Sequence, residues 1–262
     1  MGSRKRRYRA PLALLALLAL AAGPHVAAYA VAAKSAAAPA KKSARRPTAA
    51  KTGADCLGRA LGGMENIARV STLYARYQIE AGGVTRTSVL WRDVRGAVCE
   101  SLSVADALPE IVVFDGARGW RRGTSGAVAA LGGAELADRV TDAYLGSYMH
   151  IVPGRIPGKV ERVGLDRASG LVKLRVTPQG GTPATLFLDT LTCLPARIAQ
   201  STGGHTQTFH LGDWRTVSGI KLAYAIRRTT GDSTIARLTV LDARFDAPPP
   251  AGVFARPAPV VP

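Results

Sequence analysis

The stretch STLYARYQIE, residues 71–80, decides the fold because its apolar residues recur at every second position. This alternation places four apolar residues on one face of a strand: Leu73, Ala75, Tyr77 and Ile79. A Gly-Gly pair at 82–83 then turns the chain into a second segment of the same kind, Thr85–Val94. Period-two patterning on both sides of a glycine turn is typical of an antiparallel hairpin with one buried face.

The same patterning continues from this hairpin to the C-terminus. Nine further strands are predicted: Ala97–Ser103, Glu110–Phe114, Lys159–Leu165, Leu171–Thr177, Thr185–Asp189, Ala196–Ser201, Thr206–Leu211, Lys221–Thr229 and Thr234–Phe245. Two helices are predicted, Leu57–Val70 and Ala134–Tyr148, because apolar residues recur there every three or four positions. About eleven strands and few helices indicate a mainly β (α+β) domain, residues 54–254, with one strongly curved antiparallel sheet.

The N-terminus has the form of an export signal. Five basic residues at positions 4–9 precede the apolar run Pro11–Ala22, and an Ala-x-Ala cleavage site follows at 28–30. We therefore predict a signal peptide over residues 1–30 and a periplasmic location. The alternative is an uncleaved inner-membrane anchor, since residues 10–33 are long enough to cross a bilayer, although Pro24 and His25 interrupt them.

The charge of the chain is concentrated in its first residues. Residues 31–53 consist almost wholly of Ala, Lys, Arg, Ser, Pro and Thr, a composition that predicts a disordered tether. Residues 1–53 hold 11 of the 35 basic residues and none of the 18 acidic ones, so the net charge of +17 falls to +6 beyond them. A mildly basic domain without an aromatic-rich basic stripe does not favour nucleic acid as a partner. Residues 255–262 form a Pro-rich tail.

A series of short motifs connects the domain to a known family. A strand runs into Asp115-Gly116, and Trp120 follows four residues after the glycine. Further motifs occur in order along the chain: Ala60–Gly63, Leu90-Trp91, Leu186–Asp189 with Leu194–Arg197, Asp213–Leu222, and Phe245 with Pro248–Val253. In this order the chain resembles the LolA/LolB-like superfamily of outer-membrane lipoprotein-sorting proteins, from about residue 58 to residue 254.

The resemblance implies both a fold and a function. It implies a half-open antiparallel β-barrel around a hydrophobic cavity, with an N-terminal helix and a helical lid. Its members bind lipoprotein acyl chains or other amphiphiles, and related domains act as periplasmic sensors. The lipoprotein carrier has a buried arginine soon after its Leu-Trp motif, and the nearest candidates here, Arg92 and Arg95, stand at a different offset.

Ten residues are candidates for the wall of such a cavity: Leu73, Tyr77, Trp91, Phe114, Trp120, Leu186, Ile198, Phe209, Tyr224 and Ile226. Three residues of the second predicted helix are candidates for the lid: Leu136, Val140 and Tyr144. The alternative for both sets is an ordinary packed core, because alternation shows which residues share a face and not whether the space beside them is empty.

The sequence lacks several common catalytic and metal-binding motifs. The sequence contains no G-x-S-x-G, H-E-x-x-H, P-loop or G-x-G-x-x-G motif. His205 and His210 are five positions apart, which directs them to opposite faces of a strand, and we predict no metal site or cofactor. Cys56, Cys99 and Cys193 allow three disulfide pairings, and the sequence does not choose between them.

These observations favour a non-enzymatic periplasmic carrier or binder of acyl chains or other lipids. Its expected partners are a lipid or acylated lipoprotein and a membrane-bound donor or acceptor protein. The second interpretation is a protein-binding sensor or accessory module with the same fold, and the third is a secreted hydrolase.

Overall fold

A computed structural model describes residues 48–148, 150–152, 156–202 and 205–261. The predicted signal peptide and most of the predicted tether lie outside these residues. The helices are α1 (Thr48–Ala60), α2 (Met64–Arg69) and α3 (Gly133–Gly146). The strands are β1 (Thr72–Ala81), β2 (Val84–Asp93), β3 (Val98–Leu102), β4 (Glu110–Phe114), β5 (Gly119–Arg122), β6 (Val128–Ala130), β7 (Gly158–Leu165), β8 (Val172–Pro178), β9 (Ala184–Leu188), β10 (Pro195–Thr202), β11 (His205–Val217), β12 (Ile220–Thr230) and β13 (Ser233–Phe245).

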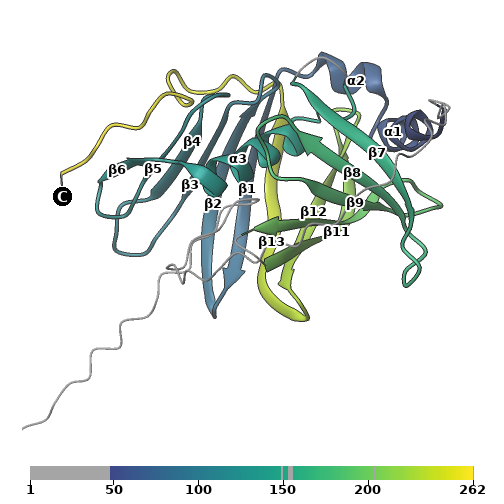
Figure 1. The fold of residues 1–262 in the computed structure, drawn as a ribbon. Coiled ribbons are helices and arrows are strands. Elements are labelled where there is room, and N and C mark those ends of the chain that lie inside the picture. Colours follow the sequence, from purple (N-terminus) through teal and green to yellow (C-terminus); the bar gives the residue numbers. More distant parts are fainter. Residues whose placement is uncertain (1–47, 149, 153–155, 203–204, 262) are drawn as a thin grey trace, which may run out of the picture.

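The thirteen strands of the described chain form one antiparallel sheet that curves around α3 without closing (Figure 1). The strand order is β6-β5-β4-β3-β2-β1-β13-β12-β11-β10-β9-β8-β7. Each neighbouring pair is consecutive in the sequence except β1 and β13, where Leu73 is paired with Phe245. All eleven predicted strands are present. The prediction missed β5 and β6, which are only 4 and 3 residues long and form the far edge of the sheet.

The predicted helix Leu57–Val70 is wrong in one respect, because the structure divides it into α1 and α2. The division falls at Gly62 and Gly63, whose φ angles are +124° and +93°. A Cβ at Gly62 would lie 2.2 Å from the carbonyl oxygen of Gly219, so only glycine allows this close approach. The N–H of Lys221 donates to the carbonyl of Leu61 over 2.8 Å and holds the bend against β12. At the other end α1 begins at Thr48, inside the segment predicted as a tether.

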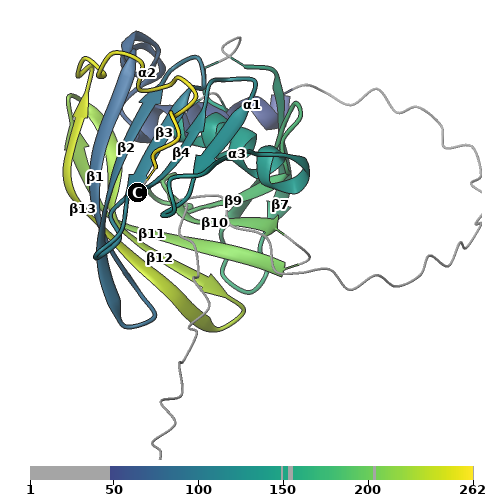
Figure 2. The ribbon, with the colours of Figure 1, turned by 90° about the vertical axis from the view of Figure 1, so that its left-hand side faces the viewer.

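The hydrophobic core consists of two clusters on the inner face of the sheet. The first joins α1 and α2 to strands β8 and β9 through residues such as Leu57, Ile67 and Leu186. The second lies under β1, β2, β3 and β13 and includes Ile79 and Leu238. Helix α3 lies inside the curve of the sheet between the two halves (Figure 2). Its apolar residues contribute to both clusters, which makes it the element that fills the half-open barrel.

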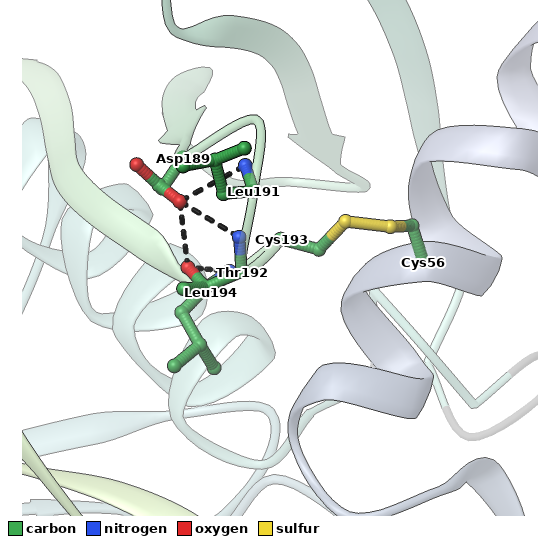
Figure 3. The surroundings of a disulfide bond; sticks show 6 residues. All are labelled: Cys56, Asp189, Leu191, Thr192, Cys193 and Leu194. Atoms are coloured by element: carbon green, nitrogen blue, oxygen red, sulfur yellow. Dashed lines mark hydrogen bonds between the residues drawn. A yellow bond between two sulfur atoms is a disulfide. The ribbon is translucent and has the colours of Figure 1, made fainter.

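A disulfide between Cys56 and Cys193 ties α1 to the turn between β9 and β10 (Figure 3). Their Cα atoms are 5.8 Å apart and their positions differ by 137 residues. The turn is ordered by Asp189, whose carboxylate accepts hydrogen bonds from the N–H and the hydroxyl of Thr192 at 2.7 and 2.9 Å. Cys99 is free and buried.

The chain beyond β13 returns towards β6 instead of leaving the domain (Figure 1). At its start, the carboxylate of Asp246 accepts hydrogen bonds from the N–H and the hydroxyl of Ser71 at 2.7 and 2.8 Å. Near its end, the N–H of Val260 donates to the carbonyl of Gly126 over 3.1 Å. The segment from Asp246 to Val260 is therefore attached near both of its ends to residues that flank strands of the sheet.

Candidate functional site

A pocket of about 150 Å³ opens on the inner face of the sheet. It lies between the C-terminal end of α3, the middle strands and the bend between α1 and α2. Most of its lining is apolar: Leu61, Leu73, Leu145, Leu186, Pro195, Ile198, Leu211, Trp214, Leu222, Ala223 and Ile226. Six strands contribute to this pocket, β1, β2, β9, β10, β11 and β12, and on β12 the consecutive residues Leu222 and Ala223 both line it. The period-two pattern therefore does not define the pocket by itself.

The pocket also has a polar side, formed by Tyr77, Arg92, Tyr148 and His150. Burial raises the pKa of the Tyr77 hydroxyl above its ordinary value, and the nearby Arg92 guanidinium opposes that rise. Burial also lowers the pKa of His150 to about 4, so its imidazole is neutral at pH 7. The Nδ1 atom of His150 is buried without a hydrogen-bond partner among the described residues. This side of the pocket is therefore uncharged except for Arg92.

Arg92 connects the pocket to α3 through a buried ion pair. Its Nη2 atom lies 2.6 Å from Oδ1 of Asp142, and the two side chains are 5% and 0% exposed. Its Nη1 atom donates to the backbone carbonyl of the same aspartate over 2.9 Å. Asp142 also lies 3.3 Å from Nη1 of Arg139, which in turn is 3.5 Å from Glu100 on β3. Helix α3 is thus held to β2 and β3 by charged groups removed from water.

The other half of the sheet holds α3 through neutral partners. The Asp138 carboxylate accepts hydrogen bonds from the Thr182 hydroxyl at 2.7 Å and from the Gln200 amide at 2.9 Å. The Thr141 hydroxyl donates to the carbonyl of Thr182 over 2.6 Å. One helix therefore bridges both halves of the open barrel, and its C-terminal residues Leu145 and Gly146 border the pocket.

The structure brings together half of the predicted wall residues. Five line the pocket: Leu73, Tyr77, Leu186, Ile198 and Ile226. Trp91 and Trp120 do not, because both lie on the outer face of the sheet, opposite Tyr74 and Val113. There Trp91 packs on Tyr74 with ring centroids 4.8 Å apart, and Arg118 lies over Trp120 at 5.4 Å.

The remaining three predicted wall residues pack elsewhere. Phe114 and Phe209 are buried, and neither borders the pocket. Tyr224 packs against the second core cluster, and the guanidinium of Arg215 lies 4.4 Å from the centre of its ring.

Of the lid candidates, Tyr144 is buried in the first core cluster, while Leu136 and Val140 pack against the second. The helix that carries them, α3, lies over the inner face of the sheet (Figure 2).

Several residues that line the pocket were not among those predicted from the sequence. Trp214 and Leu211 belong to a strand whose alternation is broken at Asp213, which has a positive φ of 49°. Leu61 belongs to the bend at Gly62, which was expected to be helical. Arg92 could be anticipated, because it is one of two arginines near the Leu-Trp motif. In the structure Arg92 is buried and Arg95 is exposed.

The described residues contain no group of three or more His, Cys, Asp or Glu side chains placed to hold a metal ion. His205 and His210 both lie on β11. Among the same residues, no helix has the length and apolar character needed to span a bilayer.

The fold defined by these elements is a half-open antiparallel barrel with one helix in its opening. No family model matches the chain, and no curated protein matches its sequence. Solved structures do share the fold.

One such structure is a LolA superfamily protein from Nitrosomonas europaea, 9% identical with a TM-score of 0.54, over 78% of this chain and 96% of that one. A second is a putative outer membrane lipoprotein-sorting protein domain from Vibrio parahaemolyticus, 13% identical with a TM-score of 0.51, over 79% and 97%. A third is a DUF1329 family protein from Desulfovibrio piger, 15% identical with a TM-score of 0.52, over 78% and 96%. The resemblance to the LolA-like superfamily is thereby confirmed at the level of the fold.

Proposed function

We propose that the protein binds an acyl chain, or another amphiphile of similar width, in the inner-face pocket and shields it from water without catalysis. The observation that carries this proposal is an apolar pocket bordered by the bend between α1 and α2, by α3 and by strands from both halves of the sheet. Each methylene that leaves water for such a wall contributes about 0.8 kcal/mol. Binding therefore needs no strong polar contact.

The size of the pocket indicates how loading occurs. Ligand sites usually enclose about 300–1,000 Å³, whereas this pocket measures about 150 Å³. A long acyl chain therefore enters only if α3 moves away from the sheet. The buried ion pair between Arg92 and Asp142 opposes that movement, and we assign it the role of a latch that holds α3 beside the pocket.

We place this activity in the periplasm, with a membrane-bound donor or acceptor protein as partner. The support is the basic and apolar N-terminal sequence together with the disulfide, since disulfides persist mainly in oxidising compartments. Export would also bring the pocket next to the membranes that contain acylated proteins.

The test begins with the chain purified from a Gram-negative periplasm without detergent. Native mass spectrometry should detect a bound amphiphile, and a fluorescent fatty acid should bind to delipidated protein. Trp214→Ala, which removes a lining side chain, should weaken binding of the fluorescent probe. Trp120→Ala is the matched control, because it removes an indole from the outer face.

A folded protein that neither carries nor accepts amphiphiles would contradict the proposal and favour the protein-binding interpretation. Equal effects of the two tryptophan substitutions would contradict the assignment of the pocket.

A further inference from the structure

A row of cationic side chains crosses the outer face of the sheet, one on each of several neighbouring strands. Arg237 of β13 is paired with Arg227 of β12, and Arg227 with His210 of β11. His210 is paired with Arg197 of β10. The row continues through Phe187 of β9, which lies opposite both Arg197 and Lys173 of β8. We call the set Arg237, Arg227, His210, Arg197 and Lys173 the cationic row.

The cationic row faces away from the pocket. Its neighbours along β12 and β13, Ile226 and Leu238, face the inner side, where Ile226 lines the pocket and Leu238 is 3% exposed. Since successive side chains of a strand point to opposite faces, Arg227 and Arg237 point outwards. Both are exposed.

Repulsion between like charges in the cationic row lowers the stability of the sheet. Like charges directly opposite each other on neighbouring strands destabilise a sheet, and Arg227 stands opposite Arg237, whose neighbour on the other side is Glu80 of β1. Among the described residues, no salt bridge involves either of these two side chains, while Arg197 is 2.7 Å from Asp166 at the side of the row. Burial lowers the pKa of His210, and Arg227 and Arg197 lower it further, so this imidazole is neutral at pH 7 and the charge of the row is carried by its arginines and Lys173.

The shape of the row indicates the shape of its partner. Small neutral residues flank it on both sides from β9 to β13, with Thr239, Ala225 and Gly212 in one adjacent row and Thr208, Ala199 and Thr185 in the other. On β8 the second of these rows continues with the exposed Arg175. From β9 to β13 the cationic row is therefore one residue wide. Five steps between strands at about 4.8 Å each give it a length of roughly 24 Å.

We propose that the cationic row binds an extended acidic segment of a partner polypeptide that lies across the strands. A line of positive charge one residue wide matches a line of carboxylates, whereas a bilayer surface would be met by a broad patch. Arginine guanidinium groups bind carboxylates with paired hydrogen bonds. At about 3.3 Å per residue, roughly seven extended residues cover the row. This interaction uses the face opposite the pocket and is independent of amphiphile binding.

The test compares two variants of the full chain that lose the same charge. Arg227→Gln with Arg237→Gln removes the two most exposed members of the row. Arg59→Gln with Arg256→Gln removes two exposed arginines elsewhere, in α1 and in the chain beyond β13. The probe is a fluorescent peptide of about ten residues in which Glu alternates with Gly, measured by anisotropy at about 0.1 M salt, where distant charges are largely screened.

We expect the dissociation constant of the peptide to rise about tenfold in the row variant and less than twofold in the control. The His210 ring signals should also shift in NMR spectra of the unsubstituted protein when the peptide is added. Binding of the fluorescent fatty acid should not change in either variant, which separates this proposal from that of the pocket.

Equal peptide affinity in both variants would overturn the proposal. It would also be overturned if the row variant lost binding to vesicles that contain anionic phosphatidylglycerol but kept its affinity for the peptide, because the row would then dock on a membrane.

Discussion

Replacing Asp142 by Asn removes the charge at the centre of the network that holds α3. The Asp142 side chain is 0% exposed and faces Arg92 at 2.6 Å and Arg139 at 3.3 Å. After the substitution Arg139 keeps Glu100 at 3.5 Å, but Arg92 keeps only neutral acceptors on residue 142, the backbone carbonyl and the amide oxygen of Asn. Removing one partner of a buried pair costs about 3–5 kcal/mol. We expect Asp142→Asn to lower the free energy of unfolding by about 3 kcal/mol, at the lower end of this range, because the Asn side chain still offers a hydrogen-bond acceptor.

Urea unfolding at pH 7, followed by tryptophan fluorescence, measures this loss. Asp166→Asn is the matched control, because its pair with Arg197 is partly exposed and should contribute less than about 1 kcal/mol. The combined change of Arg92 and Asp142 to Leu should destabilise the protein less than the sum of the two single changes, since it leaves no unpaired charge. A loss below about 1 kcal/mol for Asp142→Asn would refute the view that α3 is held by this pair. The same variant should also load the fluorescent fatty acid faster.

Three further outcomes are expected. Removal of the disulfide by Cys56→Ser with Cys193→Ser should cost about 5 kcal/mol of stability, since the bond closes a loop of 137 residues; thermal melts with and without reductant measure the loss. The pKa of His150 lies near 4 in the folded protein and near 6.5 unfolded, so the unfolded chain binds the extra proton between these values. Stability should therefore fall by up to about 3 kcal/mol as the pH drops from 6.5 to 4, and His150→Asn should flatten this dependence in urea titrations. Trp214→Ala should weaken binding of the fatty acid at least fivefold and Trp120→Ala should leave it unchanged, as isothermal titration would show.

The strands were predictable because period two survives along most of the sheet. Strand β1 illustrates this, since its odd-numbered residues from Leu73 to Ile79 all face the core. Strands β5 and β6 were not predictable, because three or four residues are too few to show an alternating pattern.

The side of the sheet that a residue faces was harder to predict than the strand itself. In β2 the buried residues of the inner face are Ser88, Leu90 and Arg92, of which only Leu90 is apolar. Trp91 has the largest aromatic side chain of that strand, yet it packs on Tyr74 on the outer face. Because the inner face of this sheet carries buried charges and the outer face carries stacked aromatic rings, hydrophobicity does not distinguish inner from outer residues. Half of the predicted wall therefore lies elsewhere.

The pairing of β1 with β13 also determines the order in which the sheet can be completed. The other neighbouring strands of the described sheet are adjacent in sequence, so β1–β6 and β7–β12 can each form from local contacts, which are fast to find. The two halves are joined where β1 pairs with β13, and this pairing brings together residues about 170 positions apart, such as Tyr74 and Arg244. Until β13 is available, β1 and β12 are long open edges of the kind that recruits foreign strands. A chain that stops before residue 233 would hold two unjoined half-sheets, and we expect it to aggregate.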